Sequence, residues 1–248
     1  HLKAVERLGI PRVMVSDGPH GLRKQDQSAD HLGINDSIKA VCFPSGSCSA
    51  CSFDRDLLFQ IGQAPGNECQ AENIAMLLGP GMNIKRSPLC GRNFEYYSED
   101  PVLCGKMGAA EASAASEKGL ITFTKHYVLN DQELHRQDNG YCSWVNEQAF
   151  REVYLRAWEI YMKEATRTIN YYGTNEAGEY EMMSTEMSGA TGIMSCYNRI
   201  GATYGGASIS INGILRTEWG FTGTVITDAG GEPDTYMTTD FALRRGQN

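Results

Sequence analysis

The chain has 248 residues, 41% of them hydrophobic and 21% charged, which is the composition of an ordinary globular domain. Its apolar runs are all shorter than the roughly 20 residues of a spanning helix, which argues against a membrane role. The net charge of -8 argues against nucleic acid, because phosphate-binding surfaces carry clustered Lys and Arg. A neutral or cationic ligand fits this charge better, and the length suits one barrel-sized domain.

The start of the chain and its cysteines give limited information about location. The chain begins at His1 without a secretory leader pattern, so we expect a removed start or a piece of a longer protein. Cys48 and Cys51 form one CxxC, but a zinc site would need a second ligand pair. The eight cysteines therefore predict scattered reduced thiols and no metal site, and they favour a reducing compartment such as the cytoplasm.

Five short apolar or β-branched runs predict strands, and each ends in polar or Gly-rich residues. They are residues 13–17, 75–79, 120–126, 193–197 and 224–228. Helices are predicted over 100–118, 143–166 and 212–219, and the longest has apolar residues at intervals of three and four. Pro65 predicts a break in any helix over 54–71.

Residues 167–190 interrupt this alternation of strands and helices. Their Gly, Asn, Ser and Glu content predicts a long loop. Such a loop is either a solvated insertion or a lid over the strand ends. Both interpretations stay open from the sequence alone.

The alternation of strands and helices predicts an α/β fold with parallel pairing, either a doubly wound sheet or a (β/α)8 barrel. The barrel is favoured because polar groups follow the strand ends, where barrels place their functional loops. A dinucleotide-binding sheet would need GxGxxG after its first strand, and the sequence lacks it. Five strands are fewer than eight, so we expect one domain over 1–248 with an incomplete barrel.

Several polar residues near these strand ends are candidates for binding a polyhydroxylated ligand. Lys125 and His126 are followed by Arg136, which together supply many hydrogen-bond donors, although Lys125 and Arg136 could equally be rim ion pairs. Asp17 stands at a Gly-Pro turn and could be a turn residue. Arg92 and Tyr197 are two further candidates, and they follow other strands. Tyr197 could equally be an aromatic side chain of the core.

Asp228 is the sharpest candidate, because it follows a buried-looking strand and precedes Ala-Gly-Gly. A desolvated carboxylate costs several kcal/mol unless it is paired, which indicates a function. Donors from Lys125 and Arg136 are expected to keep Asp228 ionised. An ionised carboxylate beside a sugar-sized cavity is the nucleophile that retaining glycoside hydrolysis requires.

Five ordered motifs give the chain a family resemblance, from about Leu8 to Asn248. They are SDGPHGLR, GPGMNIKRSPLCGRNFEYYSEDP, KHYVLNDQELHR, MSCYN and GFTGTVITDAGG. Together they resemble the catalytic barrel domain of glycoside hydrolase family 3, in its β-glucosidase branch. The resemblance implies that Asp228 is the nucleophile and that Tyr197 lies near it. It also implies that five residues grip the sugar hydroxyls: Asp17, Arg92, Lys125, His126 and Arg136.

Hydrolysis with retention of the anomeric configuration needs a second carboxyl group, which acts first as the acid and then as the base. Glu95, Glu232 and Asp234 are available, but nothing in the sequence marks one of them. The resemblance implies that a following α/β domain supplies this group. No metal or organic cofactor is expected, because two carboxyl groups suffice for the chemistry.

Three functional hypotheses follow. The leading one is an exo-acting retaining β-glycosidase that removes terminal β-linked glucose from glucosides or oligosaccharides. The second is a sugar-binding barrel fragment without catalysis, because the chain lacks an identified acid. The third is a barrel aldolase that uses Lys125 as a Schiff-base amine.

Overall fold

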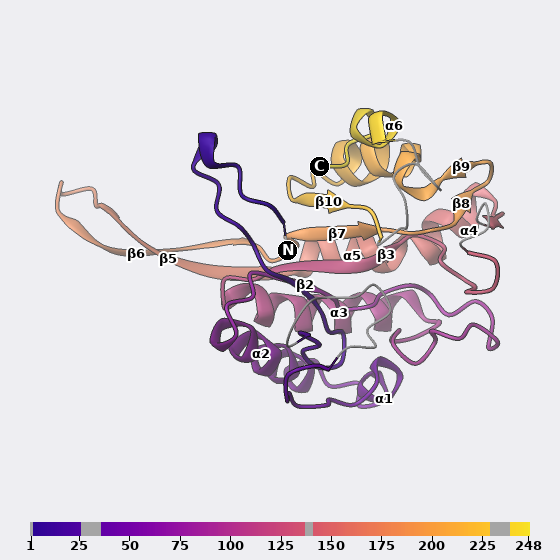
Figure 1. Ribbon diagram of the computed structural model, residues 1–248, viewed down its shortest axis with the longest axis horizontal. Coiled ribbons are helices and arrows are strands. Elements are labelled where there is room, and N and C mark those ends of the chain that lie inside the picture. Colours follow the sequence, from indigo (N-terminus) through magenta and orange to yellow (C-terminus); the bar gives the residue numbers. More distant parts are fainter. Residues whose placement is uncertain (1, 26–35, 137–140, 229–238) are drawn as a thin grey trace.

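The computed structural model describes residues 2–25, 36–136, 141–228 and 239–248 (Figure 1). Its centre is a five-stranded sheet in the order β1-β2-β3-β7-β10, and every neighbouring pair is parallel. These strands are β1 (Val15–Asp17), β2 (Met76–Leu78), β3 (Ile121–Tyr127), β7 (Gly192–Ser195) and β10 (Thr224–Ile226). The five predicted strands are therefore confirmed, most of them shortened by a few residues.

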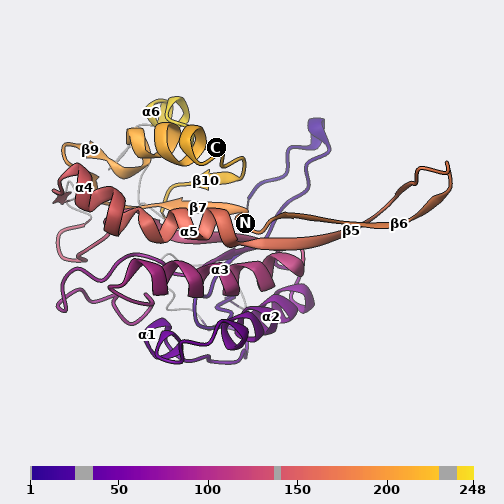
Figure 2. The same ribbon diagram turned by 180° about the vertical axis from the view of Figure 1, so that it is seen from behind.

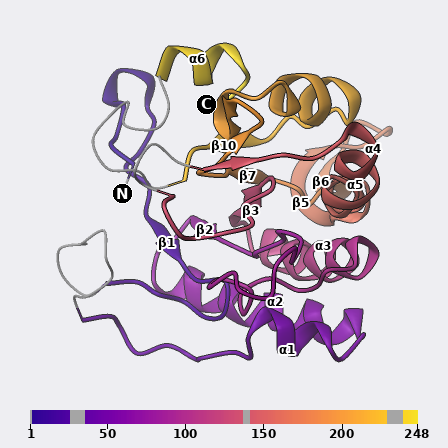
Figure 3. The same ribbon diagram turned by 90° about the vertical axis from the view of Figure 1, so that its right-hand side faces the viewer.

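The sheet is wound in one direction only. Its strand order follows the chain order, whereas a doubly wound sheet reverses direction at a switch point. Figures 2 and 3 show the long helices on one side of the sheet: α2 (Arg55–Ala71), α3 (Pro101–Glu117) and α5 (Arg156–Glu164). The α/β class with parallel pairing is confirmed, while β1 and β10 are the sheet edges within the described segments.

The other helices and a second small sheet complete the body of the protein. The additional helical turns are η1 (Glu6–Leu8), α1 (Gly46–Ala50), α4 (Glu147–Ala149), η2 (Phe150–Tyr154), η3 (Gly205–Ala207), η4 (Ser210–Glu218) and α6 (Thr239–Arg244). A small separate sheet contains β4 (Cys142–Ser143), β8 (Arg199–Ile200) and β9 (Thr203–Tyr204). No helix in the described part of the chain is long and apolar enough to cross a bilayer.

The predicted helices form for identifiable local reasons. Asp100 caps α3 by accepting the Leu103 amide at 2.7 Å, and Pro101 occupies the first turn, where no amide donor is needed. The predicted helix over 143–166 appears as α4, η2 and α5, which follow one another with a single intervening residue. The third prediction, 212–219, corresponds to η4, whose hydrogen bonds are of the π type.

The prediction that Pro65 breaks the helix over 54–71 is wrong. Helix α2 runs through Pro65, although the missing amide removes one helical hydrogen bond at a cost of roughly 3 kcal/mol. Pro65 lies on the buried stripe of α2 with Leu58, Gly62, Gly66 and Cys69. Packing of this stripe, largely against α3, offsets the lost bond.

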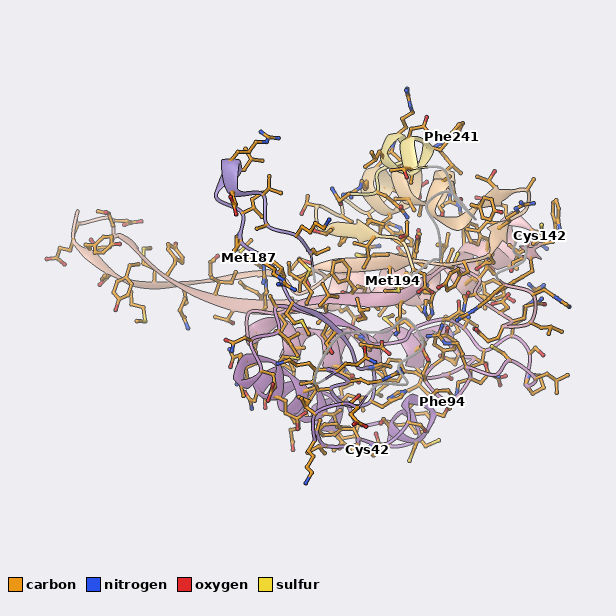
Figure 4. The ribbon with its side chains drawn as sticks, in the orientation of Figure 1. Cys42, Phe94, Cys142, Met187, Met194 and Phe241 are labelled. Carbon is orange, nitrogen blue, oxygen red and sulfur yellow. The ribbon has the colours of Figure 1, made fainter. Side chains whose placement is uncertain are left out.

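The predicted loop at 167–190 is instead a β-hairpin of β5 (Thr166–Thr174) and β6 (Tyr180–Ser188), paired over nine positions. Both of its faces are largely exposed, so the sequence lacks the alternation that a half-buried strand shows. Figure 1 shows the hairpin extending away from the body of the protein. Met187 lies near its base, and Met194 lies inside the body on β7 (Figure 4).

The base of this hairpin excludes the lid hypothesis. Gly189 donates its amide to Ala165 at 2.8 Å, just before the amino end of β7. The Ser116 hydroxyl, near the end of α3, donates to the Gly189 carbonyl at 2.8 Å. The hairpin therefore leaves the sheet at the edge opposite the carboxyl ends of the strands.

Glycine permits close contact between neighbouring helices. A Cβ atom on Gly62 of α2 would lie 2.2 Å from the Glu111 carbonyl oxygen and 3.0 Å from Ala114 Cβ on α3. A Cβ atom on Gly105 of α3 would lie 2.7 Å from Ile160 Cβ on α5. The spacing of these three helices thus depends on residues without side chains.

We expect Gly62→Ala to lower the free energy of unfolding by about 1–3 kcal/mol, because the new methyl group meets backbone that cannot move aside. Denaturant unfolding measures this change. The matched control is Gly213→Ala, whose Cβ would lie 3.3 Å from the exposed side chain of Ile209 and should cost little. Equal stabilities of the two variants would contradict tight helix packing at Gly62.

A partly buried carboxyl group on α3, that of Glu111, gives a pH-dependent stability. Burial raises the pKa of Glu111 to about 7, although the Tyr97 hydroxyl, 2.5 Å from Glu111 Oε2, partly opposes the shift. Because the pKa of Glu111 is higher in the folded state, the protonated side chain favours folding. Its contribution to the free energy of unfolding is complete below the unfolded pKa near 4.5 and is lost as pH rises through about 7.

Replacing Glu111→Gln should therefore stabilise the protein relative to wild type above pH 7, by on the order of 2 kcal/mol, and have less effect near pH 5. Denaturant unfolding across this range measures the difference. Glu117→Gln, at the exposed end of the same helix, is the control. A difference that does not change with pH would show that Glu111 does not titrate as described.

Candidate active site

The carboxyl edge of the parallel sheet gathers the predicted site residues. Asp17 ends β1, Lys125 and His126 lie in the last part of β3, and Tyr197 and Asp228 each follow their strand by two residues. Neighbouring parallel strands end at the same edge, which explains why residues distant in sequence meet there. Figure 3 views the protein from the side toward which β7 points in Figure 1.

Asp17 and Lys125 form an ion pair across this edge. Lys125 Nζ donates to Asp17 Oδ1 at 2.8 Å, and the Lys125 side chain is only 5% exposed. Burial alone would raise the pKa of Asp17, but the charges of Lys125, Arg23 and Arg92 together hold it below its usual value. Asp17 therefore presents an ionised carboxylate near neutral pH.

The two arginines at the site also have carboxylate partners. Arg92 binds Glu95 through two hydrogen bonds of 3.0 and 2.7 Å, and Arg136 binds Glu133 at 2.6 Å. The Arg136 guanidinium also stacks over the Tyr197 ring, 4.6 Å from its centre. We expected Lys125 and Arg136 to donate to Asp228, and the structure instead pairs them with Asp17 and Glu133.

Asp228 is buried, with 8% of its surface exposed, and its Oδ2 lies 3.3 Å from His126 Nε2. His126 is 1% exposed, and its Nδ1 lies 2.7 Å from the Tyr96 hydroxyl. Burial, followed by the charges of Arg92, Lys125 and Arg136, holds the pKa of His126 well below its usual value. A neutral imidazole therefore lies against the carboxylate at neutral pH.

Tyr197 remains a neutral phenol beside the same carboxylate. Burial, reinforced by the negative charge of Asp228, raises the pKa of Tyr197 to about 12. The structure thus brings all seven predicted residues to one edge of the sheet.

Sequence analysis missed Tyr96 as a site residue. Tyr96 is fully buried and connects His126 to Asn130, whose Nδ2 donates to the Tyr96 hydroxyl at 3.3 Å. A tyrosine within the segment 94–97 gives no local signal, because its partner lies 30 residues away. Only the three-dimensional arrangement identifies it.

A cavity of about 760 Å³ is lined by residues of the segments 86–91, 131–134 and 141–144. Glu133, the partner of Arg136, contributes to its wall, and the exposed Trp144 and Leu89 lie on its lining. This volume is in the range of small-ligand sites. Of the charged pairs, only Glu133 lines this cavity, and none of the seven predicted site residues does.

Metal ligation finds no support in the described segments. No group of three or more His, Cys, Asp or Glu there is arranged to hold a metal ion. All eight cysteines are free thiols, and Figure 4 shows Cys42 and Cys142 far apart on the molecule.

Comparison with protein families matches residues 3–169 to the glycosyl hydrolase family 3 N terminal domain. The chain belongs to glycoside hydrolase family 3. This family 3 chain is also similar along nearly its whole length to characterised proteins.

Two curated relatives and one solved structure illustrate the similarity. Thermostable β-glucosidase B of Acetivibrio thermocellus is 40% identical over 244 residues, which are 98% of this chain and 29% of the relative. An exo-α-(1→6)-L-arabinopyranosidase of Bifidobacterium longum is 37% identical over 94% of this chain and 28% of its own length. β-Glucosidase 3B of Thermotoga neapolitana in complex with glucose has a TM-score of 0.79 at 33% identity, over 98% of this chain and 30% of that one.

The family 3 chain therefore spans less than a third of these relatives. Of the candidate second carboxyl groups, Glu95 is paired with Arg92 and is 5% exposed, which makes it a structural partner of that arginine. Glu232 and Asp234 lie outside the described residues.

The neutral state of His126 predicts acid-dependent instability. Because the pKa of His126 is lower in the folded state, the neutral side chain favours folding. Its contribution to the free energy of unfolding is complete above the unfolded pKa near 6.5 and is lost as pH falls toward the folded pKa. We expect the stability advantage of wild type over His126→Gln to shrink between pH 7 and pH 5, by at most about 1.4 kcal/mol per pH unit. Denaturant unfolding at several pH values measures it.

His135→Gln is the control, since His135 is exposed. The difference in free energy of unfolding between His135→Gln and wild type should show no comparable change between pH 7 and pH 5. A constant gap between wild type and His126→Gln would mean that His126 titrates alike in the folded and unfolded states.

Proposed function

We propose that this chain is the barrel domain of an exo-acting retaining β-glycosidase, with Asp228 as the nucleophile. The observation that carries the proposal is the burial of Asp228 at the carboxyl edge of the sheet, against a neutral imidazole and among paired charges. Membership of glycoside hydrolase family 3 supports the same chemistry.

The proposed reaction has two steps. In the first, an Asp228 carboxylate oxygen forms a bond to the anomeric carbon while the bond to the leaving oxygen breaks, and an acid protonates that oxygen. In the second, the conjugate base takes a proton from water, whose oxygen replaces Asp228 on the anomeric carbon. The acid and base is one carboxyl group supplied from outside the described residues, for which a second α/β domain of the full protein is our proposal.

The barrel is part of the same proposal. A sheet wound in one direction with its helices on one side is the arrangement of consecutive (β/α) units in a barrel. The TM-score of 0.79 to a longer β-glucosidase supports an incomplete barrel of this kind.

The ion pairs suit recognition of a sugar. A sugar hydroxyl both donates and accepts a hydrogen bond, and neighbouring hydroxyls lie about as far apart as the members of a close ion pair. In the proposal, Asp17 accepts from one hydroxyl while Lys125 donates to its neighbour. Arg92, His126, Arg136 and Tyr197 complete the surroundings of the ring.

The proposed glycone is terminal β-linked glucose, since several similar proteins are β-glucosidases. An α-L-arabinopyranoside is the second candidate, because one relative is an arabinopyranosidase. The two sugars differ at the hydroxymethyl group and at one ring hydroxyl. The rates at which the protein hydrolyses the two corresponding aryl glycosides therefore distinguish the candidates.

A 2-deoxy-2-fluoro β-glucoside should trap the glycosyl-enzyme in the full protein that contains this chain, and its mass should appear on the peptide carrying Asp228. Asp228→Asn should lower kcat by about 10³-fold or more, because the amide cannot form the intermediate. Asp131→Asn is a matched control: Asp131 is also 8% exposed but binds Arg86 and Asn83.

Label on another residue would contradict the assignment of Asp228. Glucose binding without hydrolysis in the full protein would favour the non-catalytic sugar-binding fragment. The Schiff-base alternative gains no support from the geometry, because Lys125 Nζ donates to Asp17.

A further inference from the structure

The hairpin of β5 and β6 leaves most of its surface without contacts. Within the described part of the chain it is a separate two-stranded sheet, so both of its outer strand edges are unpaired. Each strand has nine residues and spans about 30 Å. Contacts with the body occur at the base, where Thr166 donates its amide to Ser113 Oγ at 3.0 Å. A hairpin on its own is marginally stable in water, which indicates that a partner covers this one.

Large apolar side chains lie exposed along this hairpin. Tyr172 and Tyr180 stack on each other across the two strands, with ring centres 5.8 Å apart, yet they remain 61% and 74% exposed. Three further members of this group are between 43% and 62% exposed: Tyr171, Met182 and Met187. Clusters of exposed tyrosine and methionine are typical of protein–protein contact surfaces. The hairpin therefore has the composition of a contact surface.

The hairpin is also acidic. No Lys or Arg occurs between residues 168 and 198, whereas four carboxylates of the hairpin are exposed: Glu176, Glu179, Glu181 and Glu186. Among the described residues, none of these four is in an ion pair, and Glu181 accepts a hydrogen bond from Asn175 Nδ2 at 3.0 Å. A surface that covers the hairpin should therefore be apolar and should supply cations.

The N-terminal arm, residues 2–13, has the matching properties. It folds back on itself through antiparallel bridges of Leu2 with Val13 and of Val5 with Ile10, and all of its residues except Val13 are exposed. Its exposed large apolar side chains are Leu2, Val5, Leu8 and Ile10. Beside the single carboxylate of Glu6 it carries three cations, which have no ion pair within the described segments: Lys3, Arg7 and Arg12.

The arm and the hairpin project from the same side of the protein. The arm leads into β1 and the hairpin leads into β7, so each lies at the amino end of a strand. Figures 1 and 2 show both of them on this side, with the tip of the hairpin far from the arm of the same molecule. The hairpin thus points away from its own arm, whereas a two-fold axis on this side brings each hairpin onto the arm of a second copy.

We propose that the hairpin is a dimerisation element that docks on the N-terminal arm of a second copy of this protein. The contact is reciprocal, because a two-fold dimer contains two hairpins and two arms. In this contact the exposed tyrosines and methionines cover the apolar side chains of the arm, and the four carboxylates meet its three cations. Asp228 lies at the opposite edge of the sheet, so the inference does not depend on the proposed function.

Reversing the charges on either element should weaken the dimer of the full protein that contains this chain. One variant combines Glu179→Lys with Glu186→Lys on the hairpin, and the other combines Arg7→Glu with Arg12→Glu on the arm. Sedimentation velocity over a series of concentrations gives the dissociation constant of the dimer. Each double variant should raise this constant at least about tenfold, because like charges then face each other.

Mixing the two variants tests whether the contact joins two copies. A mixed dimer pairs a basic hairpin with an acidic arm at one contact and an acidic hairpin with a basic arm at the other. Its dissociation constant should therefore return to within about threefold of wild type, which also shows that both variants fold. Failure to restore the dimer would overturn the inference, since another part of the same molecule would then cover the hairpin. A wild-type protein that stays monomeric would overturn it as well.

The apolar part of the contact has its own test. Tyr172→Ser combined with Tyr180→Ser should raise the dissociation constant about a hundredfold, because exposed aromatic anchors contribute most at such contacts. Leu89→Ser is the control, since Leu89 is 91% exposed but lies outside both the hairpin and the arm, and it should leave the dimer unchanged. An unchanged dimer in the tyrosine variant, or an equal effect of Leu89→Ser, would contradict docking through the hairpin.

Discussion

The site depends on holding one buried carboxylate, Asp228, against a neutral imidazole at the carboxyl edge of the sheet. Asp228 lies against a neutral imidazole, while the nearby cations have carboxylate partners in the pairs Lys125–Asp17, Arg92–Glu95 and Arg136–Glu133. In the proposed reaction, a carboxylate at this position suits a transition state that develops positive charge on the sugar.

This arrangement depends in turn on the central strand. Strand β3 lies between β2 and β7 and is buried over almost its whole length, so Lys125 and His126 have little freedom to move. Helix α3 packs on both α2 and α5 through contacts that require Gly62 and Gly105. The hairpin of β5 and β6 leaves from the opposite edge, so this hairpin does not cover the carboxyl edge.

Much of the fold could be predicted because burial leaves a pattern in the sequence. The runs at 120–126 and 224–228 are apolar or β-branched since the sheet covers them, and the residues that follow are polar since the strands end there. The hairpin could not be predicted, because strands exposed on both faces need no alternation. Pro65 misled the prediction because local propensity ignores the packing of its helix face.

The partners of the site residues were the harder problem, since the ion pair of Lys125 and Asp17 joins residues 108 positions apart. Sequence analysis grouped His126 with Lys125 because they are neighbours and both carry nitrogen donors. In the structure, Lys125 reaches β1 while His126 lies between Tyr96 and Asp228. Neighbouring positions in the motif therefore do not imply the same partners. Lys125 thus binds a carboxylate on β1, while His126 contacts Tyr96 and Asp228, and only the three-dimensional arrangement separates their surroundings.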